Sequence, residues 1–327
     1  MATTTKPDTV AMFELLPGVF RIETELGGNL LALHLLRGTR TLLIDSGVRD
    51  TPGTAIFPAL AAAGLPARID MLLVSHADAD HHGGNAALRA GAPGTVIMCH
   101  EHDRPWVEAK AAHLAGRYQQ VLAGHDLGYA PELMRWLDAM IGADTPADLG
   151  LHGGETIGLG DGRRWQVLHA PGHTAGHLVL WEPERRVLIA QDAVLGRGVP
   201  DRAGRLASPP PYYDAGSYIA TLAQLRALQP EWLLTAHYPV MRGAAADTFL
   251  AESQAFAEQA DAAVLAIVRA AGRPLTLSAV VAALDARLGP FDLTIQWVGP
   301  ALAHLARHVA AGRLIAHADG PACAWAA

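Results

Sequence analysis

The sequence is short of cysteine, of long apolar runs and of basic residues. Two cysteines, Cys99 and Cys323, occur among 327 residues, so a disulfide framework is disfavoured and a reducing compartment is expected. No run of about eighteen apolar residues is present, and residues 1–8 lack the apolar core of a signal peptide. We therefore expect a soluble, cytoplasmic protein that does not bind a membrane.

The charge balance limits the class of partner. The formal net charge is −7 and the sequence pI is about 6.1. Because polyanions are bound by concentrated lysine and arginine, nucleic acid is disfavoured as a partner. With 50% hydrophobic and 17% charged residues, the composition is typical of a folded globular protein. The length allows one large domain with a small one, or two domains of medium size.

Side chains that can bind a cation are concentrated in one stretch, directly after a short apolar run. His76, Asp78, Asp80 and His81 fall within six positions. An extended segment sends alternate side chains to one face, so the first three can converge, and a helical turn brings His81 beside them. The alternative is a polar loop that caps the next helix. The density of nitrogen and oxygen ligands favours a site for zinc, iron or manganese.

The pattern His76-x-Asp78-x-Asp80-His81, followed by two glycines, resembles the His-x-His-x-Asp-His signature of metallo-β-lactamase-fold hydrolases. Asp78 stands where most members carry a second histidine. Three further segments follow in the order of that family: residues 171–177 with His173, 191–194 with Asp192, and 235–239 with His237. Four motifs in the right order are more specific than any one of them.

The resemblance implies an α+β fold, a four-layer αββα sandwich over residues 1–243. Within it, short branched runs broken by glycine predict an antiparallel meander over residues 19–44. Further strands are expected at 71–74, 95–99, 165–169, 178–181, 187–190 and 232–235. Residues 101–149 predict a helical insertion with helices over 103–123 and 131–141. Its large aromatic residues indicate a wall of the substrate pocket, with ordinary packing on the sheet as the alternative.

The tail, residues 244–327, has a helical pattern and resembles the winged-helix-like domain of some relatives. We expect helices over 276–287 and 297–311 and a small wing after them. The tail contains five arginines, no lysine and seven acidic residues, whereas a DNA-binding tail would be basic. We therefore expect it to pack on the core, close the pocket or join two subunits as a homodimer.

The resemblance also implies the metal ligands. The first ion would be held by His76, Asp78 and His173, and the second by Asp80, His81 and His237, with Asp192 between the two ions. We expect two divalent ions, zinc first. Iron and manganese are the alternatives, because the carboxylate at position 78 is a harder ligand than imidazole. Asp45, in a family-like Asp-Ser-Gly segment, would support these ligands from behind or would only form a turn.

These ligands predict a metal-dependent hydrolase. A metal-bound hydroxide would attack a small ester, lactone or thioester with an apolar or aromatic part, and Asp80 would pass a proton to the leaving group. The candidate substrate-contact residues are His82, Trp106, Tyr212, Tyr213 and Tyr238. For most of them the alternative is a purely structural role. His177 is expected to be buried or to support a ligand. The alternatives are a phosphodiesterase or nuclease, a diiron redox protein of the same fold, and a non-catalytic partner-binding protein.

Overall fold

The first sheet contains seven strands in the spatial order β1 to β7. The computed structural model describes residues 11–318 and 322–327. The strands are β1 (Ala11–Leu16), β2 (Val19–Leu26), β3 (Asn29–Arg37), β4 (Thr41–Ile44), β5 (Met71–Leu73), β6 (Val96–His100) and β7 (Leu149–Leu151). The first four pair antiparallel, which confirms the meander, and the last three join in parallel. Strands β1 and β7 were not predicted.

The second sheet has six strands in the order β15-β14-β11-β10-β9-β8. They are β8 (Thr156–Gly158), β9 (Arg164–His169), β10 (Leu178–Glu182), β11 (Val187–Ile189), β14 (Trp232–Leu234) and β15 (Met241–Arg242). A separate hairpin is formed by β12 (Val199–Pro200) and β13 (Leu206–Ser208), and a proline-rich loop of residues 209–214 follows it.

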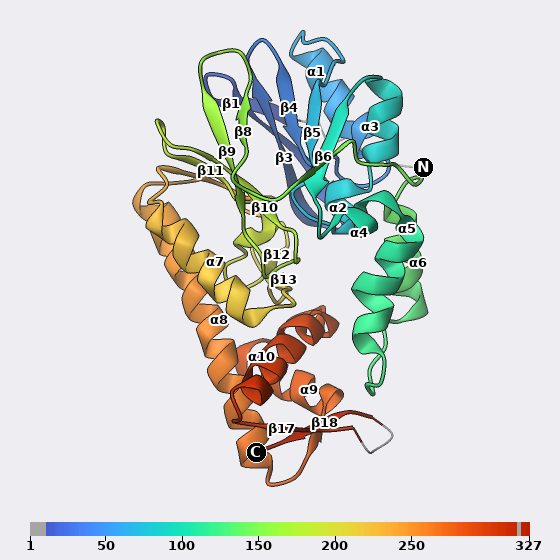
Figure 1. Cartoon of the computed structure of the whole chain (residues 1–327), viewed down its shortest axis with the longest axis vertical. Coiled ribbons are helices and arrows are strands. Elements are labelled where there is room, and N and C mark those ends of the chain that lie inside the picture. Colours follow the sequence, from blue (N-terminus) through green and yellow to red (C-terminus); the bar gives the residue numbers. More distant parts are fainter. Residues whose placement is uncertain (1–10, 319–321) are drawn as a thin grey trace, which may run out of the picture.

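The two sheets pack face to face through a shared core, to which Leu36, Leu42 and Ile44 contribute from one side and Trp165, Val167 and Leu180 from the other. Helices η1 (Pro52–Ile56), α1 (Phe57–Ala62) and α3 (Asn85–Gly91) pack with the first sheet, and α7 (Ala215–Ala227) packs with the second (Figure 1). This burial of apolar faces on both sides of each sheet stabilises the sandwich.

The insertion is less regular than predicted. Instead of one helix over 103–123, it contains α4 (Arg104–Glu108), α5 (Lys110–His113), η2 (Leu114–Gln119) and η3 (Gln120–Leu122), followed by α6 (Pro131–Met140). The break lies at Ala109, which has extended backbone angles. There the Lys110 N–H donates to Asp144 Oδ1 at 2.9 Å instead of continuing the helix. This distant partner could not be predicted from helical periodicity.

The C-terminal elements are α8 (Ala244–Ala271), β16 (Leu275–Thr276), α9 (Leu277–Leu288), η5 (Thr294–Trp297), α10 (Val298–Ala310), β17 (Ile315–His317) and β18 (Ala324–Ala326). Figure 1 shows α8 running from beside α7 down to the other C-terminal helices. Accordingly Leu250 and Ala257 pack with the second sheet, whereas Val264 packs in a separate core with Trp297. The first half of α8 thus joins the C-terminal elements to the sandwich.

None of the described helices is both long and apolar enough to cross a bilayer. Residues 1–8, on which the expectation about a signal peptide rests, lie outside the described residues.

Candidate metal centre

The loop after β5 carries the first ligands because the chain changes direction there. Asp78 is extended, and the short helix α2 (Ala79–His82) starts directly after it. A Cβ atom on Gly84 would lie 2.3 Å from the carbonyl oxygen of Ser46. Only glycine therefore lets this loop pack closely against the turn at the end of β4.

The structure brings all seven predicted ligands together in three overlapping groups. Within each group, one candidate ligand atom per residue lies within 4.8 Å of the others. The groups are His76, Asp78 and His173; His76, His81 and Asp192; and Asp80, His81 and His237. His173, Asp192 and His237 are far along the chain from residues 76–81, so the fold of the sandwich brings them to this loop.

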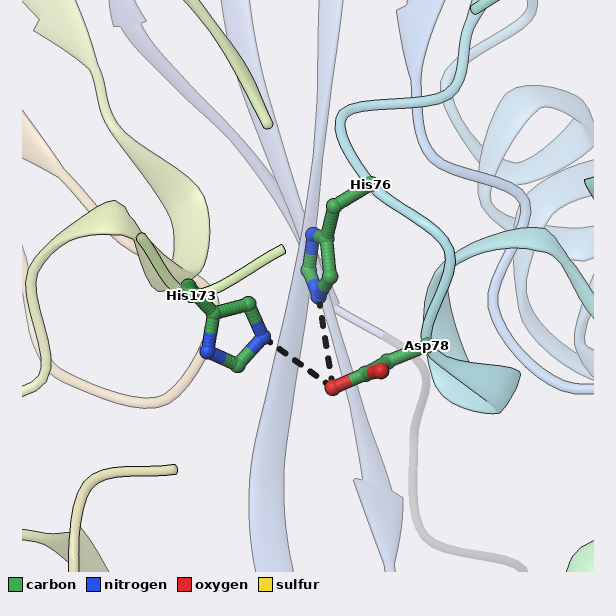
Figure 2. Close-up of side chains that lie close together, drawn as sticks. All are labelled: His76, Asp78 and His173. Carbon is green, nitrogen blue, oxygen red and sulfur yellow. Dashed lines mark hydrogen bonds and ion pairs between the residues drawn. The ribbon is translucent and has the colours of Figure 1, made fainter. Parts of the chain in front are cut away.

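The first group is centred on one carboxylate. Figure 2 shows His76 and His173 pointing toward Asp78 from two different segments. The Nε2 atoms of these histidines lie 3.8 and 3.0 Å from Asp78 Oδ2. Nitrogen and oxygen atoms at these separations suit a shared divalent ion.

The other end of the centre holds the remaining carboxylates. Asp80 Oδ2 lies 3.6 Å from His81 Nε2 and 3.7 Å from His237 Nε2. Asp192 Oδ2 lies 3.6 Å and 3.2 Å from the same two atoms. Asp192 is part of η4 (Gln191–Ala193), directly after strand β11.

Hydrogen bonds behind the histidines support metal binding. The Nδ1 atoms of His81, His173 and His237 lie 2.8, 2.5 and 2.8 Å from Asp45 Oδ2 and from the carbonyl oxygens of Pro211 and Leu30. These acceptors require a proton on Nδ1, so Nε2 offers a lone pair to the centre. His173 Nε2 then faces a carboxylate oxygen at 3.0 Å, and two acceptors approach so closely only with a cation or proton between them.

The carboxylates of the site also favour bound cations, as the pKa shifts of their neighbours show. Burial works against a charged histidine at position 237, but the neighbouring carboxylates of Asp192 and Asp80 outweigh it and raise its pKa to about 9. Burial likewise disfavours ionisation of Asp192, yet His237 and His81 hold the pKa of this carboxyl well below its usual range. The residues present therefore fit a pair of divalent ions.

Asp45 bonds His81 and so supports the end of the centre that contains His81, Asp80 and His237. This is the supporting role that the sequence predicted as one of two possibilities. Asp45 is fully buried and adopts a left-handed backbone conformation, with φ of 66°. Besides its bond with His81, its carboxylate accepts from the Ser75 N–H at 2.7 Å, the Ser75 hydroxyl at 2.9 Å and Gln191 Nε2 at 2.6 Å. The buried carboxylate thus ties three segments together.

Arg117 is a residue of the candidate site that the sequence did not reveal. It lies in η2 of the insertion, only 3% exposed, and its Nε and Nη2 atoms donate to Asp78 Oδ1 and Oδ2 at 2.6 and 2.8 Å. Burial alone would raise the pKa of Asp78, but the guanidinium charge holds it well below its usual range. No motif marks Arg117. The available signal was chemical, because an additional buried carboxylate calls for a cationic partner.

Asp103, also missed, clamps two ligand loops together. Its Oδ2 accepts from the Ala77 N–H at 2.9 Å and the Thr174 hydroxyl at 2.6 Å, and its Oδ1 accepts from the Gly176 N–H at 2.7 Å. The loops that carry His76 and His173 are thereby fixed relative to each other. His177, expected to be buried, stacks on His76 with ring centroids 4.7 Å apart.

The centre opens into a cavity of about 390 Å³. Metal-site residues form one end. Its wall is mostly apolar and comes from α6, from the β2–β3 turn and from the C-terminal segment, with Leu26, Leu133, Trp136, Leu137, Met140 and Leu293. A larger depression of about 830 Å³ beside α7 and α8 contains none of the metal-site residues. Residues of the insertion therefore line the cavity beside the candidate metal centre.

Of the five side chains considered as substrate contacts, one lies at the cavity and four lie elsewhere. Tyr213 lines the cavity, whereas the other four do not. His82 is buried and hydrogen-bonds His113, Tyr212 is fully buried against His304, and Tyr238 donates to the carbonyl of Leu195. A fourth side chain, Trp106, packs with the core of the first sheet. These polar aromatic groups find partners in the interior, which directs them away from the pocket.

Comparison with families and curated proteins gives several matches. A family model described as the metallo-beta-lactamase superfamily matches residues 27–237. A probable metallo-hydrolase of Bacillus subtilis (strain 168) is 25% identical over 220 residues, which cover 62% of this chain and 76% of that protein. The hydroxyacylglutathione hydrolase of Dechloromonas aromatica (strain RCB) is 28% identical over 240 residues, 73% and 69% of the two chains. An acyl-coenzyme A thioesterase of Gallus gallus is 27% identical over 226 residues, 64% and 73%.

Solved structures resemble almost the whole chain. A metallo-beta-lactamase family protein from Thermus thermophilus has a TM-score of 0.75 at 20% identity, covering 96% of this chain and 99% of that one. A beta-lactamase domain protein from Burkholderia ambifaria has a TM-score of 0.76 at 22% identity, covering 99% and 97%. The predicted mixed α+β fold is thereby confirmed.

Proposed function

The chain belongs to the metallo-beta-lactamase superfamily, and from that premise we propose a two-metal hydrolase of small carboxylic esters, lactones or thioesters with an apolar or aromatic part. The three curated relatives carry the names of hydrolases, which confirms the prediction of a hydrolase in this superfamily. The observation that supports the proposed substrate class is a complete set of ligands at the end of an apolar cavity.

The proposed ligands are those predicted from the motifs: His76, Asp78 and His173 for one ion, Asp80, His81 and His237 for the other, and Asp192 for both. Bound divalent ions would supply an activated water and stabilise negative charge on the substrate carbonyl oxygen. We propose zinc first, with iron or manganese as alternatives, because three carboxylates make the ligand set harder than usual.

The protein's own groups orient the substrate and move the proton. Asp80 lines the cavity, so its carboxylate can accept a proton from the attacking water and pass it to the leaving group. The side chains of Leu133, Trp136 and Leu137 line the same cavity and would hold the apolar part of the acyl group out of water. Tyr213 is the proposed aromatic contact at the metal end.

The cavity favours an uncharged substrate. Among the described residues that line it, Arg117 is the one arginine or lysine, and its guanidinium is already paired with Asp78. Away from the metal ligands, a strongly anionic leaving group would find no free guanidinium or ammonium group there. We therefore propose that neutral esters and lactones are cleaved faster than glutathione or coenzyme A thioesters, which the names of two relatives mention.

This function is tested by removing the metal with a chelator, restoring zinc, manganese or iron, and assaying aryl esters, lactones and acyl thioesters of increasing chain length. We expect activity to disappear, to return with one of the metals, and to rise with the length of the acyl chain. If no ester, lactone or thioester reacts after any remetallation, the proposal fails. If the charged thioesters react best, the proposed substrate preference fails.

A diiron redox protein is the second candidate, since the three carboxylates also suit iron. It would show a visible iron chromophore and turnover that depends on oxygen. A phosphodiesterase or nuclease, the other alternative, would bind RNA or DNA with a steep salt dependence.

We also propose that the elements from α8 onward form a winged-helix-like domain that joins two subunits, in a cytoplasmic protein that binds neither nucleic acid nor membrane. The acidic balance of this segment supports the part of the proposal that concerns nucleic acid, because a nucleic-acid-binding segment would be basic. Sedimentation of the full chain tests the dimer, and a monomer at all concentrations would contradict it.

A further inference from the structure

We propose that Arg117 and Asp78 form a unit that replaces the second histidine of the family motif, which makes Arg117 a positioning residue of the first ion site. This inference rests on the proposed two-ion centre. It concerns how the ion is held rather than which substrate is cleaved.

The geometry couples the two side chains tightly. Two parallel hydrogen bonds of 2.6 and 2.8 Å join the guanidinium to both oxygens of Asp78, and such bidentate pairs fix orientation as well as charge. The carboxylate is thereby held with Oδ2 toward His173 Nε2 at 3.0 Å and His76 Nε2 at 3.8 Å. A ligand oriented by a partner behind it binds metal more tightly than a free one.

The charges explain why the pair is needed. A carboxylate in place of a neutral imidazole adds one negative charge to the centre. The guanidinium of Arg117, which is 3% exposed, returns one positive charge. The pair together is therefore neutral, like the histidine that it replaces, and the two-ion site keeps the net charge of the usual ligand set.

Arg117 also touches the other parts of this half of the centre. Its Nη1 donates to the carbonyl oxygen of His173 at 3.3 Å, and its guanidinium carbon lies 4.0 Å from the centre of the Tyr213 ring. Tyr213 belongs to the same loop as Pro211, whose carbonyl accepts from His173 Nδ1. One buried arginine thus contacts two ligands and the loop that orients one of them.

Metal content of dialysed protein tests this proposal, because it is read without any substrate. Wild-type protein is expected to retain two ions. In Arg117→Met, the binding affinity for one ion is expected to fall by about 10- to 100-fold, which is the usual effect of removing a group that orients a ligand. The double variant with Asp78→His and Arg117→Met is expected to regain two ions, because imidazole needs no cationic partner. Elemental analysis and titration calorimetry with zinc give both quantities.

Two comparisons separate this role from ordinary packing. Arg104→Met, which removes another arginine of the insertion that pairs with Glu101 and Glu108, is expected to keep both ions. Asp78→His alone leaves the buried guanidinium unpaired and is expected to unfold at lower denaturant than the double variant. If Arg117→Met does not fold, Arg117→Lys replaces it. Its affinity for the same ion is expected to fall by less than the about 10- to 100-fold predicted for Arg117→Met, because lysine keeps the positive charge but cannot form the two parallel hydrogen bonds.

The proposal is overturned if Arg117→Met or Arg117→Lys binds both ions as tightly as wild type, or if the double variant binds no better than Arg117→Met. A wild-type protein with fewer than two ions overturns both this proposal and the two-ion centre. A wild-type protein that holds two ions but cleaves no ester, lactone or thioester contradicts the proposed function alone.

Discussion

The two halves of the metal centre are supported by different parts of the chain. The half with Asp80, His81 and His237 is oriented by the sandwich itself, through Asp45 after β4 and the carbonyl of Leu30 in β3. The half with Asp78 and His173 is oriented by segments outside the sheets: Arg117 in the insertion and Pro211 in the proline-rich loop.

The loop of the second half is in turn bonded to the C-terminal elements. The hydroxyl of Tyr212, next to Pro211, lies 2.7 Å from His304 Nε2, and His304 Nδ1 lies 3.0 Å from Asp261 Oδ1. The sandwich therefore holds the side chains of one proposed ion site, whereas the insertion and the C-terminal segment contact those of the other. Variation in those segments can change one ion site without changing the fold.

Asp192→Asn should weaken metal binding in both halves of the centre, because this carboxylate contacts His81 and His237 and also lies near His76. We expect both ions to bind more than about 100-fold more weakly, since loss of a supporting group alone costs about 10- to 100-fold. Elemental analysis after dialysis measures this. Retention of two ions would show that Asp192 is not a shared ligand.

Asp45→Ala should weaken mainly the half supported by the core, because Asp45 bonds His81 directly but reaches His76 only through the Ser75 hydroxyl. We expect the ion near His81 to bind about 10- to 100-fold more weakly, and the free energy of unfolding to fall by about 1–3 kcal/mol because Ser75 and Gln191 lose a buried acceptor. Zinc titration and urea unfolding test the two effects. Asp50→Ala, in the same connection but in an exposed ion pair, is the control, and an equal loss at both ion positions would contradict the division.

Tyr212→Phe should disturb the other half through the C-terminal segment. The loss of one buried hydrogen bond leaves His304 Nε2 unpaired, so the free energy of unfolding should fall by about 1–3 kcal/mol, with a smaller loss of affinity for the ion near His173. Tyr218→Phe is a matched control. Its ring stacks on Tyr212 at 4.3 Å, and its hydroxyl has no hydrogen-bond partner within the described residues. If both variants lose the same stability, Tyr212 does not couple the segments.

Trp136→Ala should affect the pocket wall but neither ion. This side chain lines the cavity and is 45% exposed, so we expect about a tenfold lower kcat/KM for long acyl chains, near the low end for a lost apolar contact, and a smaller change for acetyl esters. Leu149→Ala, a similarly exposed apolar residue of β7 that does not line the cavity, is the control. An equal effect on short and long chains would show that Trp136 does not contact the acyl group.

The sequence could predict the proposed metal ligands but not the residues that support them. The clustering of the proposed ligands could be predicted because each motif keeps its His or Asp beside recognisable strand and glycine signals, as at His76 and His173. Their supports could not, because their partners are remote: Arg117 bonds Asp78 from 39 positions away, and Asp103 bonds Thr174 across 71. Arg117 lies in an irregular helical segment with no motif around it, so only the folded chain reveals its partner.

The two-ion centre is tested most directly by anomalous diffraction from crystals of zinc-loaded wild-type protein. The account predicts two peaks, one within coordination distance of His76, Asp78 and His173, and the other of Asp80, His81 and His237, with Asp192 between them and Arg117 still bonded to Asp78. A single peak, or an Asp78 carboxylate turned away from the metal toward Arg117 alone, would contradict it.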